Sequence, residues 1–133
     1  MKRLLMIAAV LVLFGCASKY AFVPDCCGTF QGVLPAASGP GIETTITFYR
    51  DNSFETKLVY IGEKDGTFIE RGTYDIDDGV IEMRPEKDQI SYYQLDEHNP
   101  NRIYRLNMEK KPITGQLAQY YVLRKIEACK WRM

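Results

Sequence analysis

Hydrophobic and polar residues alternate along most of this chain with the two-residue period of a β-strand. Two successive segments each place four residues on one face: Ile42, Thr44, Ile46 and Phe48, then Phe54, Thr56, Leu58 and Tyr60. No apolar stripe with a helical period runs through the rest of the chain. Only Gln116–Gln119 and the tail from Ile126 are weak candidates for helix.

Turn-forming residues divide the chain into short segments. The sequence Asp77-Asp78-Gly79 is typical of a tight hairpin, and Gly72 predicts a bulge or bend within its strand. The predicted strands are Gly28–Leu34, Ile42–Tyr49, Ser53–Ile61, Thr67–Asp75, Val80–Arg84, Ser91–Leu95, Arg102–Met108 and Tyr120–Lys125. In the pairs Tyr92–Tyr93 and Tyr120–Tyr121, one ring of each should pack inward and the other outward.

Strands joined by short turns are antiparallel, and a sheet of this many strands curls until its edges meet. We therefore predict an all-β fold, a small antiparallel up-and-down β-barrel of about seven to eight strands, with a sandwich as the alternative. A barrel of this size holds either a core of side chains or one small ligand. The pattern does not distinguish between these two interiors.

The first sixteen residues have the organisation of a lipoprotein signal. Lys2 and Arg3 precede the apolar run Leu4–Phe14, which is too short for a membrane-spanning helix of about 20 residues. Leu13-Phe14-Gly15-Cys16 resembles a bacterial lipobox, so residues 1–15 are predicted to be a signal peptide and Cys16 the lipidated N-terminus. The alternatives are an uncleaved anchor or an ordinary signal peptide.

This signal predicts where the protein resides. Two or more acyl chains on Cys16 would anchor the protein stably to a membrane. Ala17, in place of the Asp that favours the inner membrane, predicts the outer membrane, with the protein facing the periplasm. We expect residues 16–27 to form a lipidated tether, residues 28–126 the barrel domain and residues 127–133 a C-terminal tail.

Length and charge exclude several classes of function. The chain has 133 residues, which is enough for one domain. Its 17 basic and 17 acidic residues balance, so no nucleic-acid partner is expected. The single histidine, His98, lies in a polar turn, and no Gly-x-Ser-x-Gly, P-loop or zinc spacing is present. We therefore expect a protein that is not an enzyme.

The segment Gly32–Thr45 resembles the signature of NlpE-type lipoproteins, Gly-x-Leu-Pro-Cys-x-x-Cys-x-Gly-Ile-x-Thr. Weaker similarity covers Gly28–Lys125, nearly the whole mature domain. This resemblance implies an outer-membrane lipoprotein with a lipocalin-like barrel, in a family linked to envelope stress, surface sensing and copper resistance. The two signature cysteines are replaced by Ala36 and Gly39, so a metal or thiol role of that loop does not transfer.

Three cysteines remain besides Cys16. In an oxidising compartment, a disulfide from Cys26 or Cys27 to Cys129 is expected, with the third cysteine free or paired with another chain. The alternative is a copper(I) site in which Cys26, Cys27 and Cys129 act as soft ligands with a methionine such as Met133 nearby. Adjacent cysteines lack a defined chelate spacing, which makes this metal site the weaker hypothesis.

Three functions follow from these observations. The first is envelope stress or surface sensing, or copper homeostasis, by a lipid-anchored protein that contacts an envelope protein. The second is a lipocalin-like carrier of a lipid or small apolar ligand, which would need an apolar cavity. The third is metal handling through the remaining cysteines. Apart from the covalent lipid on Cys16 and this copper, no cofactor is expected.

Overall fold

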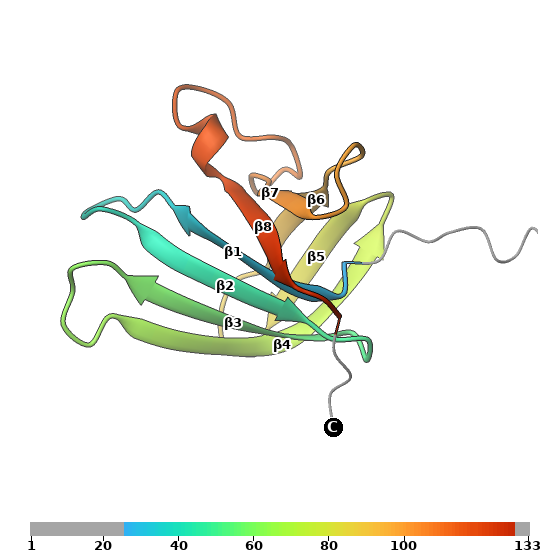
Figure 1. Ribbon diagram of the computed structural model, residues 1–133, viewed down its shortest axis with the longest axis horizontal. Helices are drawn as coiled ribbons and strands as arrows, with labels where there is room; N and C mark the ends of the chain where they lie inside the picture. The colour runs from blue at the N-terminus through green and yellow to red at the C-terminus, as the bar shows by residue number, and fades with distance from the viewer. Residues whose placement is uncertain (1–25, 130–133) are drawn as a thin grey trace, which may run out of the picture.

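The computed structural model describes residues 26–129, and their antiparallel strands close into one barrel (Figure 1). Each strand pairs with the next along the chain, and the last pairs with the first. The strands are β1 (Gly28–Leu34), β2 (Ile42–Phe48), β3 (Ser53–Tyr60), β4 (Thr67–Asp77), β5 (Val80–Pro85), β6 (Ser91–Leu95), β7 (Arg102–Arg105) and β8 (Val122–Glu127). This closed barrel confirms the fold class predicted from the sequence.

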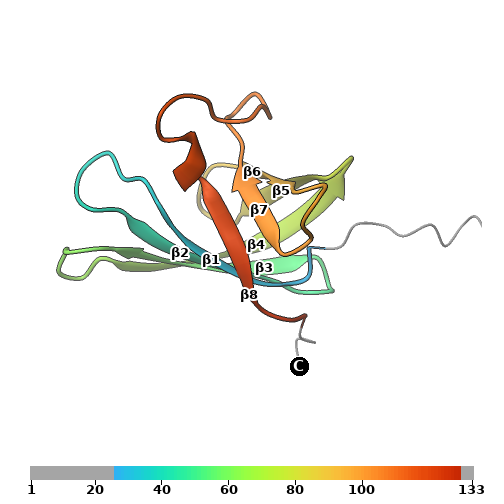
Figure 2. The same cartoon turned by 45° about the horizontal axis from the view of Figure 1, so that its top comes forward.

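The connection before β8 departs most from the sequence prediction. The strand β7 ends at Arg105 instead of Met108. Leu106 forms an isolated bridge to Pro112, and its N–H still donates to the Tyr92 carbonyl of β6 at 2.9 Å. A short 3-10 helix, η2 (Ala118–Tyr120), then precedes β8 (Figure 2). At the other end of β8, Ile126 and Glu127 continue the strand and do not begin a helical tail, because β8 pairs with β1 as far as Thr29.

The inner face of the barrel follows the alternation of the sequence. Phe30, Phe48 and Phe54 are almost fully buried inside it. The Phe48 ring meets those of Phe30 and Tyr74 edge-on, at centroid distances of 6.0 and 5.0 Å. Such pairs contribute about 0.5–1.5 kcal/mol beyond the burial of their area. These aromatic rings fill one half of the interior.

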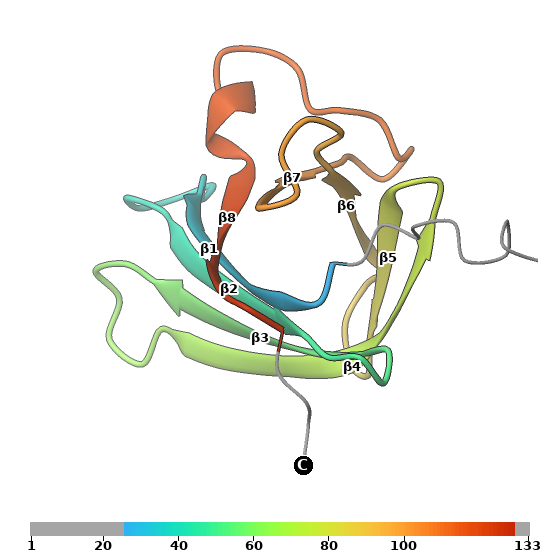
Figure 3. The ribbon, with the colours of Figure 1, turned by 45° about the vertical axis from the view of Figure 1, so that its right-hand side comes forward.

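The two ends of the barrel differ. At one end, called here the open end, lie the connections formed by residues 35–41, 61–66, 86–90 and 106–121 (Figures 1 and 3). At the opposite or closed end lie the three other turns, together with Cys26, Cys27 and the C-terminal end of β8. There the Lys125 ammonium lies 5.3 Å from the centroid of the Phe30 ring. Because Phe30 belongs to the group of buried aromatic rings, the half of the barrel that these rings fill lies at the closed end.

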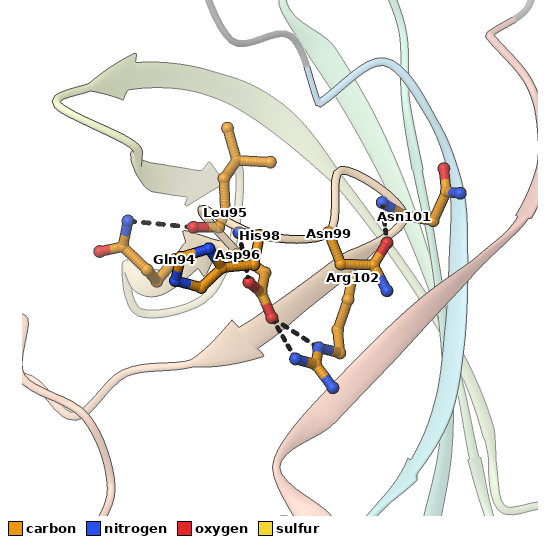
Figure 4. A network of polar contacts seen from close by, with 7 residues as sticks. All are labelled: Gln94, Leu95, Asp96, His98, Asn99, Asn101 and Arg102. Carbon is orange, nitrogen blue, oxygen red and sulfur yellow. Dashed lines mark hydrogen bonds and ion pairs between the residues drawn. The ribbon is translucent and has the colours of Figure 1, made fainter.

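A polar network stabilises the β6–β7 turn at the closed end (Figure 4). The Asp96 carboxylate accepts hydrogen bonds from the backbone N–H of His98 at 2.8 Å and from Nε of Arg102 at 2.6 Å. These donors hold the pKa of Asp96 below its ordinary value, the His98 N–H having the larger effect. The single histidine therefore acts here through its backbone, and its side chain is exposed.

We expect Asp96→Asn to lower the melting temperature at neutral pH. A carboxyl group with a depressed pKa stabilises the fold above its ordinary pKa of about 3.9 and loses that effect as the pH falls through the lowered value. The difference between variant and wild type should therefore shrink in acid. Thermal unfolding from pH 7 to pH 2 measures this, with Glu97→Gln on the same loop as the control. A difference that stays constant over this range would contradict the assignment.

Candidate functional site

The open half of the barrel is hollow. A cavity of about 280 Å³ is lined by residues of strands β1 to β7 and of the connections at this end, including the one between β5 and β6. Apolar side chains form part of its wall, including Leu34, Ile46, Leu58, Met83 and Met108. Polar side chains form the rest of the lining, among them Thr56, Glu70, Asp88, Tyr93 and Arg105. This open-end cavity is the candidate site.

The strand register explains why charged side chains face inward. Thr56 of β3 lies opposite Ile46 on one side and Glu70 of β4 on the other. Partners in an antiparallel pair point to the same face, so the buried Ile46 and Thr56 bring Glu70 inward with them. In the same way, Tyr93 of β6 brings Arg105 of β7 inward.

A pair of carboxyl groups marks one side of the cavity. Glu70 is half-buried, and its carboxyl group is hydrogen-bonded to that of Asp88 in the β5–β6 connection. Burial, this hydrogen bond and the charge of Asp88 raise the pKa of Glu70 to about 7, and the nearby positive charge of Arg105 opposes them. The Gln89 N–H, which donates to Asp88 at 2.7 Å, holds the pKa of Asp88 low, as does the bond from Glu70. The two carboxyl groups thus share one proton near neutral pH.

The other polar side of the cavity carries hydrogen-bond donors. The guanidinium carbon of Arg105 lies 5.4 Å from the centre of the Tyr93 ring. Burial raises the pKa of Tyr93, so this phenol is neutral. Among residues 26–129, Thr56 Oγ1 is the buried side-chain polar atom without a hydrogen-bond partner. An unsatisfied buried hydroxyl costs about 1–3 kcal/mol, which a group entering the cavity could recover.

We expect Glu70→Gln to stabilise the protein at pH 8 and to leave its stability nearly unchanged at about pH 4. A raised carboxyl pKa means that the folded state loses stability as the pH rises from about 4.3, the ordinary value, through about 7. Glutamine removes this penalty and can still donate to Asp88. Urea unfolding at both pH values measures the effect. An exposed control is Glu55→Gln, which removes an ion pair with Arg71 on the outer face of the barrel. Equal effects of Glu70→Gln at both pH values would contradict the prediction.

The described cysteines lie at the closed end, far along the strands from this cavity. Cys27 and Cys129 form a disulfide with Cα atoms 4.9 Å apart, and Cys26 is wholly buried in the core. Two of the three sulfurs considered for copper are therefore bonded to each other. Residues 26–129 also contain no group of three or more His, Cys, Asp or Glu side chains that could hold a metal ion. Cys16 and Met133 lie outside the described residues.

Comparison with known proteins identifies the family. A sequence model of the NlpE N-terminal domain matches residues 30–116. The chain belongs to the NlpE family. This membership confirms the resemblance seen in Gly32–Thr45, and this member has Ala36 and Gly39 where the family signature has cysteines.

Individual relatives of this NlpE-family chain agree with that assignment. The 17 kDa lipoprotein of Treponema pallidum (strain Nichols) is 32% identical over 108 residues, which are 74% of this chain and 69% of that protein. A Shewanella oneidensis protein described as a lipoprotein has a similar crystal structure, with a TM-score of 0.66 and 39% identity over 77% of this chain and 90% of that one. The Cpx pathway activator NlpE of Escherichia coli gives a TM-score of 0.60 and 27% identity, over 68% of this chain and 46% of that one. The chain thus spans less than half of the E. coli protein.

Sequence reasoning did not identify the polar residues of the cavity. Glu70 and Arg105 occur in strands where charged residues ordinarily face water, and Asp88 lies in a turn. The available signal was the alternation within each strand. Glu70 is on the same face of β4 as the inward Gly72 and Tyr74, and Arg105 is on the same face of β7 as the buried Ile103.

In residues 26–129, no helix has the length and apolar character needed to cross a membrane.

Proposed function

We propose that this NlpE-family protein is a lipid-anchored, non-enzymatic sensor of the bacterial envelope, which contacts a signalling partner through the open end of its barrel. The observation that carries this proposal is the distribution of exposed apolar side chains. Most of the large exposed apolar residues described lie on segments bordering the open end: Val33, Phe68, Ile69, Ile90, Met108, Leu117 and Tyr120. Of the large exposed apolar residues described, only Ile126 lies at the closed end. Clustered exposed apolar side chains are typical of interaction surfaces.

The anchor supports the same orientation. Cys16, the predicted lipidation site, precedes Cys26 by ten residues, and Cys26 lies at the closed end of the barrel. A lipid at this position would hold the closed end toward the membrane and leave the open end accessible. Ala17 supports the outer membrane as the location, with the domain in the periplasm. The E. coli relative is described as an activator of the Cpx pathway, which supports a signalling role of that kind.

Two other functions receive less support. A lipocalin-like carrier of lipids would need a larger apolar interior, whereas this cavity is slightly smaller than a typical drug-sized site and contains Glu70 and Arg105. For copper, Ala36 and Gly39 offer no ligands, and the Cys27–Cys129 disulfide leaves no thiolate at either position. The residues described do not fit a copper centre, so copper handling is not part of the proposal.

We expect the protein to induce an envelope-stress reporter when it is produced in excess, and the triple variant Phe68→Ser, Leu117→Ser, Tyr120→Ser to lose this induction. These substitutions remove apolar contacts at the open end without touching the core. The matched control replaces three exposed polar residues of the outer surface by serine: Glu43, Lys57 and Arg124. Cys16→Ser should move the protein from the membrane fraction to the soluble fraction. Full induction by the apolar triple variant at equal membrane abundance would refute an interaction through the open end.

A further inference from the structure

We propose that the open-end cavity binds a small molecule carrying both an ammonium and a carboxylate group, of the size of a free amino acid. The acidic pair Glu70–Asp88 would receive the ammonium, and Arg105 with Tyr93 would receive the carboxylate. The apolar wall between them would contact the rest of the ligand. The proposal names a class of ligand for the proposed sensor. Only the biological role of the ligand rests on the sensor function; the binding site itself does not.

The acidic side of the cavity has the chemistry of an ammonium site. Glu70 and Asp88 both line the cavity and interact with each other, and burial together with this interaction raises the pKa of Glu70 to about 7, so the pair holds one proton below that pH. An ammonium group brings a positive charge and three N–H donors, and it can replace this proton between the two oxygens. Both carboxylates could then be ionised without mutual repulsion.

The basic side has the chemistry of a carboxylate site. Arg105 takes part in none of the ion pairs found among residues 26–129, although its charge is felt by Glu70 across the cavity. Its planar guanidinium can donate two parallel hydrogen bonds to one carboxylate. The neutral Tyr93 hydroxyl beside it is a further donor. A ligand carboxylate would therefore meet donors here.

The volume of the cavity limits the size of the ligand, and an unpartnered hydroxyl indicates where a polar group of the ligand would lie. The cavity of about 280 Å³ lies just below the range of drug-sized sites, about 300–1,000 Å³. Thr56 is 4% exposed, and its partnerless hydroxyl lines this cavity next to Glu70. A polar group of the ligand could satisfy that hydroxyl. Opposite charges on two walls favour a ligand with two charged groups over a fatty acid or a simple amine.

Three probes with matched carbon skeletons test this inference: norleucine, hexanoate, which lacks the amine, and pentylamine, which lacks the carboxylate. Each is titrated at pH 8 into purified residues 17–133, which contain the whole barrel, and amide NMR shifts and calorimetry are recorded. We expect norleucine to bind about tenfold or more tightly than either of the other probes, because each loses a charged hydrogen-bonded contact. The shifts should concentrate on strands β3, β4, β6 and β7.

Substitutions assign each end of the ligand. Glu70→Gln should weaken norleucine binding about tenfold and leave hexanoate binding unchanged, whereas Arg105→Gln should weaken norleucine and hexanoate but not pentylamine. Arg105→Lys keeps the charge and should restore part of the affinity. The matched controls outside the cavity are Glu55→Gln and Arg124→Gln. Thermal unfolding of every variant shows whether the barrel is intact.

The pH dependence gives an independent readout. The charged and titratable groups around Glu70 are Asp88 on the β5–β6 connection, Arg105 on β7 and Tyr93 on β6; Arg71, Glu86 and Lys87 lie beside it on the surface. Since the ammonium replaces the shared proton, norleucine affinity should rise from pH 6 to pH 8, with proton release visible in calorimetry. Glu70→Gln should abolish both effects.

Several outcomes would overturn the inference. These are no binding of any probe at millimolar concentration, hexanoate or pentylamine binding as tightly as norleucine, or shifts confined to the outer surface. All these measurements use purified protein without the signalling partner. Failure to bind would thus leave the sensor proposal standing, and failure of the stress reporter would leave the binding site standing.

Discussion

Replacing Cys27 and Cys129 together by serine is expected to lower the free energy of unfolding by up to about 4.7 kcal/mol, the chain-entropy value for a loop of about 100 residues. The disulfide joins residues 102 positions apart and ties the start of β1 to the end of β8. These two strands also close the barrel. In the unfolded chain the bond restricts nearly the whole domain, so removing the bond should lower the free energy of unfolding by a large amount. Urea unfolding of the oxidised and variant proteins measures it.

Single substitutions then test which cysteine forms the bond. Cys27→Ala should remove the effect of dithiothreitol on stability, because Cys27 is the partner of Cys129. Cys26→Ala should keep this effect and lower stability only by the loss of one small buried side chain. The adjacent cysteines are thus matched controls for each other. If Cys26→Ala instead abolished the sensitivity to dithiothreitol, the pairing would be the other one that the sequence left open.

The strand alternation was sufficient to predict most of the fold. Phe48 and Phe54 lie on the faces of their strands that the two-residue period predicted, and the Asp77-Asp78-Gly79 turn forms with positive φ angles at Asp78 and Gly79. The end of β7 was predicted three residues too late. Local pattern cannot show that the regular strand ends before Leu106, because the Leu106 side chain is buried in either arrangement.

The candidate site was much less predictable than the fold. Its polar residues come from four separate parts of the chain: β3, β4, the β5–β6 connection and the β6–β7 pair. A charged residue in a strand is ordinarily read as facing solvent, although the alternation within each strand and the register across neighbouring strands both place Glu70 and Arg105 on the inner face. Asp88 reaches Glu70 because a turn folds over the end of β5. Such proximity depends on the β4–β5 register and on the path of the connection after β5, which no local pattern encodes.

Gly72→Ala should lower the free energy of unfolding by about 3 kcal/mol, the upper part of the range for overpacking, or by more. A Cβ atom at this position would lie 2.0 Å from the carbonyl oxygen of Arg84 and 2.7 Å from Cα of Pro85. Both contacts are with backbone of the paired strand β5, so they cannot be relieved by turning a side chain. Glycine in a strand interior often marks a barrel corner, and β4 bends strongly along its length (Figure 3).

Thr73→Ala is the matched control for this substitution, since Thr73 is exposed on the outer face of the same strand. It should change stability by about 1 kcal/mol or less, the span of β-propensity. Equal stabilities of Gly72→Ala and Thr73→Ala in urea would show that β4 and β5 do not approach as closely as described. Gly72 and Pro85 are the last pair of the β4–β5 register, and just beyond them the Glu86 N–H still donates to the Arg71 carbonyl at 2.9 Å. Glu70 is the next residue of β4, where Asp88 can reach it. An alanine at position 72 should therefore also separate the carboxyl pair and lower the pKa of Glu70 from about 7 toward its ordinary value, which a carbon-detected NMR titration of this side chain would measure.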